Sequence, residues 1–196
     1  MSPFMHTSDT THLETVHPIL CYVKCIINIG LHFFFYITLD LLAFSNADWE
    51  GCHTTRHSTI RFCVFLGNNL ISYCVKKQHT ISRSNTKAEY RFMANTISEV
   101  TLMTFILKDL HIPVQSPPIL YCDYFNALHM TVNPIFHARS KYIELDYHFV
   151  QEQVVIRQLV TKHVFTNNQV VDLLTKPMLK KCSCLFSNQT LPPYSI

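Results

Sequence analysis

The stretch Leu39–Gly51, LDLLAFSNADWEG, changes abruptly from apolar to polar residues. Its apolar half has no helical period and predicts a strand that is buried on both faces. The polar tip of that strand carries Asn46 and Asp48, two residues apart. Ligands and catalytic groups collect where the central strands of α/β sheets end. The stretch therefore predicts a functional site at the end of a central strand.

Two more strands and a long helix follow this stretch. The runs 60–66 and 70–75 are rich in β-branched and aromatic residues, and Gly67-Asn68-Asn69 between them is typical of a hairpin. A helix over 86–110 is predicted by one apolar stripe, made of Ala88, Phe92, Thr96, Val100, Met103, Leu107 and Leu110. We therefore expect three antiparallel strands and then a helix.

The chain then returns to the sheet. A loop over 112–118 with three prolines ends the long helix, and a short apolar strand, 119–122, stops at Asp123. A crossover of strand, helix and strand usually returns to a parallel neighbour, which predicts Asp123 beside Asn46. The remaining pattern predicts helices over 126–132 and 140–156, a strand over 159–165, and a final helix that Thr166-Asn167-Asn168 caps and that carries Asp172. The predicted class is α/β, with a mixed sheet and flanking helices.

Composition restricts the class of protein. The chain has 196 residues, of which 48% are hydrophobic, and this composition favours one globular domain plus a flanking segment. Its net charge of +3 is weak support for a nucleic-acid partner. Eight cysteines and twelve histidines include no CxxC or HExxH pattern and follow no cleavable signal. Free thiols in the cytoplasm or nucleus are expected, rather than secretion or a zinc site. The uncharged run 25–39 leaves a membrane protein as the lesser alternative, because a span needs about 20 apolar residues.

Three acids are predicted to converge on the tip of the first strand. Glu89 falls near a helix start, Asp123 at a strand end and Asp172 on the final helix. Clustered carboxylates repel one another unless cations lie between them, and a pair of Mg²⁺ ions about 4 Å apart suits phosphodiester hydrolysis. Each acid also has a structural alternative, because Thr86 and Glu89 match a capping box and the two aspartates suit helix N-termini. The joint pattern, rather than any single acid, favours a site.

Six blocks of the sequence carry a family resemblance. They resemble successive blocks of the ribonuclease H domain of copia-type retrotransposon Pol polyproteins, in the same order: NADWEGCHTTRHST, CVFLGNNLISYCVKKQ, SRSNTKAEYR, YCDYFNAL, HARSKYIELDYHFVQEQV and VVDLLTKP. The resemblance implies a five-stranded mixed sheet over 39–179, two Mg²⁺ ions, and hydrolysis of the RNA strand of RNA–DNA hybrids during reverse transcription. Residues 1–38 are expected to be a remnant of the reverse-transcriptase connection, an ancestral partner, and 180–196 an irregular tail.

The family's catalytic acids carry over onto four positions. Its metal-binding glutamate and two of its aspartates fall on Glu89, Asp123 and Asp172. Its first aspartate, in the pattern Ser-Asp-Ala-Asp-Trp, falls on Asn46, which keeps the shape of that side chain but loses its charge. Asp48 is a weaker candidate, because it lies about 6.6 Å farther along a strand. Enzymatic activity is therefore expected to be impaired or lost.

Other departures from the family pattern indicate a degenerate copy. They are Pro18 within the entry helix, Arg61 for a glycine, Tyr73 for a tryptophan, Lys87 for a glutamate and Tyr124 for an asparagine. Two alternatives to an impaired enzyme stay open. One is a non-functional transposon relic, and the other is a non-catalytic module that holds nucleic acid through phosphate contacts from Lys76, Lys77, Arg83 and Arg91.

Overall fold

The structure is a computed structural model, and it describes residues 33–35, 38–48, 58–77, 85–132 and 144–173, with single positions at 16, 20, 23, 24 and 27. One compact unit runs from Phe34 to Leu174, and a second comprises residues 1–33 and 175–196. In the second unit the backbone is helical at 16, 20, 23 and 24. The expected domain limits at residues 39 and 179 stay a prediction.

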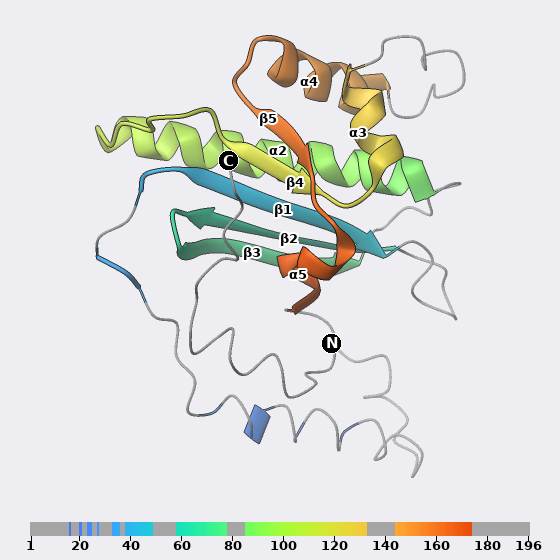
Figure 1. Ribbon diagram of the computed structural model, residues 1–196, viewed down its shortest axis with the longest axis horizontal. Helices are drawn as coiled ribbons and strands as arrows, with labels where there is room; N and C mark the ends of the chain where they lie inside the picture. The colour runs from blue at the N-terminus through green and yellow to red at the C-terminus, as the bar shows by residue number, and fades with distance from the viewer. Residues whose placement is uncertain are drawn as a thin grey trace. The chain divides into compact units, whose positions relative to one another are not determined.

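The compact unit is built on a five-stranded mixed sheet with the strand order β3-β2-β1-β4-β5 (Figure 1). The antiparallel strands are β1 (Leu41–Asp48), β2 (Thr59–Leu66) and β3 (Asn69–Lys77). The short strands β4 (Ile119–Cys122) and β5 (Val160–His163) continue the sheet in parallel with β1. The predicted hairpin and the predicted parallel return of the chain are both confirmed, and Gly67 adopts φ 55° at the hairpin turn, a value that glycine allows without strain.

The central strand β1 is buried on both faces, as its apolar sequence predicts. Leu41 and Ala43 pack with the long helix α2 (Asn85–Asp109) on one face. Phe44, on the other face, stacks on Tyr121 of β4 with 5.0 Å between ring centroids and meets Phe65 of β2 edge-on at 5.9 Å. The strand continues through Asn46 to Asp48, so the polar tip is part of the sheet rather than a loop.

Helix α2 covers the sheet with a wider face than the predicted stripe. Most of that stripe is buried, but Leu110 lies beyond the helix end and is 63% exposed. Tyr90, Met93 and Ile97 are also fully buried, because α2 packs against the helix α4 (Glu144–Val155) as well as against β1. Burial on two sides needs a broader apolar face than a single stripe provides.

The last part of the described chain adds a 3-10 turn before the final helix. Helix α3 (Phe125–Val132) and helix α4 form where the sequence predicts them, although residues 140–143 of the predicted fourth helix are not described. Thr166–Asn168 forms a 3-10 turn before the final helix, in which the N–H of Asn168 donates to the carbonyl of Phe165 at 2.8 Å. The final helix α5 (Val170–Leu173) starts after Gln169, whose side chain turns inward and is 2% exposed. The predicted capping of the final helix by residues 166–168 stays a prediction.

The membrane alternative depended on the apolar run 25–39. Most of that run lies outside the described residues. Among the residues that the structure describes, none of the helices is long and apolar enough to cross a membrane.

The described cysteines Cys63, Cys74 and Cys122 are free thiols, and the first and last of them are buried. Burial raises the pKa of the Cys63 thiol and raises that of Cys122 to about 12. At pH 8 a thiol with a pKa of about 12 is ionised in about one molecule in ten thousand, and the thiolate is the reactive form.

Alkylation of the native protein at pH 8 should therefore label Cys74 well before Cys63 or Cys122. Peptide mass spectrometry after a timed iodoacetamide pulse measures the order. The pKa values of Cys63 and Cys122 in the folded protein lie above the unfolded value of about 8.5, so these buried thiols stabilise the fold below that pH. Their contribution to the free energy of unfolding declines as the pH rises from about 8.5 to 12. Equal labelling of all three cysteines in the folded protein would contradict this prediction.

Candidate active site

Asn46 and Asp123 lie at neighbouring positions on the sheet. Asn46 belongs to β1 and is half-buried. The parallel register pairs Ser45 of β1 with Cys122 of β4, and Asp123 is the next residue after that pair. Alternation along β1 places Asn46 on the face that also carries Phe44. The structure thus places these two predicted site residues next to each other at the end of the central strands.

Glu89 reaches the same end of β1 from α2. Its side chain is 4% exposed, and its Oε1 accepts a hydrogen bond from the backbone N–H of Ala47 at 3.3 Å. Ala47 is 42 residues away in the sequence, so this hydrogen bond joins α2 to the end of β1. Thr86, the other residue of the capping pattern, shares a hydrogen bond of 3.3 Å with the hydroxyl of Tyr124. These contacts favour a site residue over a helix cap.

The pKa of the Cys122 thiol reflects both Glu89 and Asp123. Burial is the main cause of its raised pKa, and the nearby carboxylates of Glu89 and Asp123 raise it further. Both acids therefore act on the same buried atom at the end of β4. Glu89 and Asp123 thus both lie near the Cys122 thiol at this end of the sheet.

A buried glutamine ties α5 to the same place. The Gln169 Nε2 donates a hydrogen bond of 3.0 Å to the backbone carbonyl of Ser45, next to Asn46. Asp172 follows Gln169 by three residues on α5, which contacts β1 and β2. Figure 1 shows α5 drawn in front of the sheet and α2 behind it. The backbone of Asp172 is thus within one helical turn of the tether, while its side chain is outside the described structure.

Sequence reasoning missed Gln169 as a site residue. It is a polar residue directly before the apolar pair Val170-Val171, where the final helix packs onto β1. A polar residue at that position was the signal in the sequence that could have predicted a buried contact of Gln169. Sequence reasoning also treated Arg61 only as a departure from the family pattern, whereas the register pairs it directly with Asn46.

The remaining predicted residues divide into groups. Lys76 is exposed on β3 and pairs with Ile60, next to the Arg61–Val75 pair. Arg91 of α2 lies 3.5 Å from Asp146 of α4, measured from Nε to Oδ2, so it joins two helices. The backbones of Asp48 and Lys77 lie in β1 and β3 but their side chains are not described, and Arg83 falls outside the described ranges.

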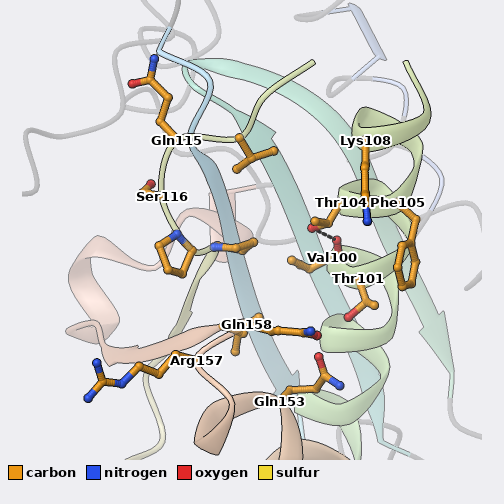
Figure 2. A pocket seen from close by; sticks show the side chains of 14 residues that line it. Val100, Thr101, Thr104, Phe105, Lys108, Gln115, Ser116, Gln153, Arg157 and Gln158 are labelled. Carbon is orange, nitrogen blue, oxygen red and sulfur yellow. Dashed lines mark hydrogen bonds between the residues drawn. The ribbon is translucent and has the colours of Figure 1, made fainter. Parts of the chain in front are cut away.

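A pocket of about 390 Å³ opens at the other end of the sheet (Figure 2). Its walls come from the second half of α2, the proline loop and the turn before β5, and include Lys108, Gln153 and Gln158. Figure 2 shows the Thr104 hydroxyl directed back to the Val100 carbonyl, a bond of 2.9 Å within α2. None of the predicted site residues lines this pocket, so its size does not identify the active site.

The described donors at the tip of β1 do not match a pair of Mg²⁺ ions. Within the described ranges, His, Cys, Asp and Glu side chains form no group of three that could hold a metal ion. Asn46 offers a neutral amide oxygen, and the residue directly across from it on β2 is a cation, Arg61. Mg²⁺ sites in proteins rely on negatively charged carboxylate oxygens. The described residues therefore do not fit the two ions that the family resemblance implies.

Comparisons with known proteins identify relatives of the chain. No protein-family model matches it. It is 42% identical over 178 residues to the retrovirus-related Pol polyprotein from transposon RE1 of Arabidopsis thaliana, an alignment that covers 91% of this chain and 12% of the relative. It is 39% identical over 189 residues to the corresponding polyprotein from transposon RE2 of the same plant, covering 96% of this chain and 13% of the relative. The chain thus spans about an eighth of the length of these relatives.

A solved structure supports the fold. The LC11 ribonuclease H1 isolated from compost superposes with a TM-score of 0.51 at 13% sequence identity, covering 69% of this chain and 92% of that protein. At this identity the likeness concerns the fold alone. The sequence relatives and the five-stranded mixed sheet agree with each other and with the predicted resemblance. The chain is therefore homologous, over most of its length, to a segment of copia-type retrovirus-related Pol polyproteins, and its described part is a domain with the ribonuclease H-like fold.

Proposed function

We propose that this domain descends from a Mg²⁺-dependent ribonuclease H and that its hydrolysis of the RNA strand of RNA–DNA hybrids is impaired or lost. The observation that carries the proposal is Asn46, a neutral amide at the end of β1 with Asp123 on one side and Arg61 on the other. Metal-assisted displacement at phosphorus requires carboxylates that neutralise two closely spaced dications. An amide oxygen cannot supply that charge.

The remaining acids are proposed to be the surviving part of the ancestral site. Glu89 is held in place by the Ala47 N–H, and Asp123 follows β4 directly. Asp172 is included because Gln169 fixes the start of its helix beside Ser45. These three residues would have held the metal in an active ancestor, and Asp48 is the weaker candidate for the missing carboxylate.

A second candidate function is binding of an RNA–DNA hybrid or another nucleic acid without cleavage. It is favoured by Lys76, an exposed cation at the same end of the sheet as Asn46. Lys77 and Arg83 would extend this basic surface. Arg91 is the weakest of the four predicted phosphate contacts, because Asp146 lies beside it on α4.

Incubation of the purified protein with an end-labelled RNA–DNA hybrid tests both candidates. We expect retention of the hybrid that weakens with salt, without cleavage in Mg²⁺. Lys76→Gln should lower the slope of log affinity against log salt by about one unit if Lys76 contacts a phosphate. Lys108→Gln is the matched control, because Lys108 is equally exposed but lies at the far end of α2.

Two other results of this experiment would each rule out one of the two candidate functions. Rapid cleavage by the unmodified chain that EDTA abolishes would show that the impaired-enzyme proposal is wrong. If the hybrid is neither cleaved nor retained, the binding function is wrong and the domain is a relic.

A further inference from the structure

Arg61 occupies the strand position directly beside Asn46. The antiparallel register of β1 and β2 pairs the two residues. Side chains of such a pair point to the same face of the sheet, with Cβ atoms about 4.5–5.5 Å apart. Arg61 is half-buried and its Nε is shielded from solvent. A permanent positive charge thus lies beside the tip of the central strand rather than at the rim of the site.

Acidic side chains from neighbouring elements reach the same end of β1. Asp123 follows β4 on the far side of β1, and Glu89 reaches the Ala47 N–H from α2. Partly buried carboxylates repel one another unless a cation lies among them. A guanidinium is suited to that role, because it stays charged at all ordinary pH values and carries five donors that match carboxylate oxygens.

We infer that Arg61 is a built-in counter-charge that takes the place of the divalent cation at this site. The Asn46 and Arg61 pair carries a net charge of +1, whereas an aspartate at position 46 opposite a neutral residue would carry −1. With Glu89 and Asp123 also at the tip of β1, this change makes the charge that would attract a divalent cation less negative by two units, so the cation is held more weakly. The inference rests on the proposed loss of metal-dependent hydrolysis and names the residue that compensates the remaining acids.

Metal binding by four proteins tests the inference. They are the unmodified chain, the single variants Asn46→Asp and Arg61→Gln, and the double variant Asn46→Asp/Arg61→Gln. Mn²⁺ is the probe, and it is followed by calorimetric titration and by the thermal unfolding midpoint in Mn²⁺ or EDTA. The unmodified chain should show no saturable binding and no shift of its midpoint. The double variant should bind Mn²⁺, and its midpoint should rise by about 5–10 °C at one hundred times the Kd.

The single variants separate the two residues. Asn46→Asp should bind Mn²⁺ at least about tenfold more weakly than the double variant, because Arg61 pairs with the new carboxylate across the strands. Arg61→Gln alone should unfold at a lower temperature than the unmodified chain in EDTA, and Mn²⁺ should restore part of the difference. Arg157→Gln, a matched control in the exposed turn after α4, should leave the response to Mn²⁺ unchanged.

Two outcomes would overturn the inference. In the first, the Asn46→Asp variant binds Mn²⁺ as tightly as the double variant does, a result that would leave the proposed loss of hydrolysis intact. In the second, an Asn46→Asp/Arg61→Lys variant, which keeps the positive charge, has the same Mn²⁺ affinity as the double variant. Should the double variant bind Mn²⁺ but cleave no hybrid, the counter-charge stands and the proposed cause of lost hydrolysis fails. Circular dichroism of each variant provides a check of folding.

Discussion

Asn46→Asp is expected to raise Mg²⁺-dependent cleavage of the RNA strand of an RNA–DNA hybrid from background by at least about a hundredfold, a gain within the range of electrostatic contributions to catalysis. The substitution returns one negative charge to the end of β1, next to Asp123 and within reach of the Glu89 carboxylate that the Ala47 N–H holds. Removing Arg61 as well should increase the rate further, because the opposing cation is then absent. Single-turnover rates on a labelled hybrid measure both steps.

Asp48 provides the matched control for this result. Asp48→Asn, introduced into the Asn46→Asp protein, should leave most of the restored cleavage, because Asp48 lies two residues farther along β1 and pairs with Thr59. Glu89→Gln in the same background should remove it. Strong cleavage by the unmodified chain that Asp48→Asn abolishes would identify Asp48 as the first metal ligand and would contradict the role given to Asn46.

Tyr90→Ala is expected to lower the free energy of unfolding by about 3–5 kcal/mol, the range for deleting a large aromatic side chain from a core. Tyr90 is fully buried, its ring stacks on that of Tyr147 with 5.8 Å between centroids, and its hydroxyl donates to the Tyr147 carbonyl at 3.4 Å. Burial raises the pKa of its phenol above the ordinary value. Because Tyr90 follows Glu89 on α2, the same packing also fixes the helix turn that presents the carboxylate.

Urea unfolding followed by circular dichroism measures this loss. Tyr90→Phe should cost only about 1 kcal/mol, since it keeps the ring and removes one hydrogen bond. Leu145→Ala, at an 87% exposed position on α4, should change the stability by less than about 0.5 kcal/mol. A Tyr90→Ala protein as stable as the Leu145→Ala protein would show that the α2–α4 contact does not stabilise the domain.

The sequence alone predicted most of the elements, since side-chain periodicity records which faces of an element are buried. The apolar run before Asn46 predicted the central strand, Gly67-Asn68-Asn69 predicted the hairpin, and the proline loop predicted the end of α2. The order of these elements also predicted β4 parallel to β1, because crossover connections favour that arrangement. Family resemblance then identified Asn46 as the altered position.

Only the tertiary structure decided how distant residues meet at the end of β1. The bond from the Ala47 N–H to Glu89, the tether from Gln169 to Ser45, and the pairing of Arg61 with Asn46 all join separate segments. Such contacts depend on strand register and helix docking, which a local pattern does not encode. The burial of Gln169 just before α5 has the same cause, because it depends on the docking of α5 against β1.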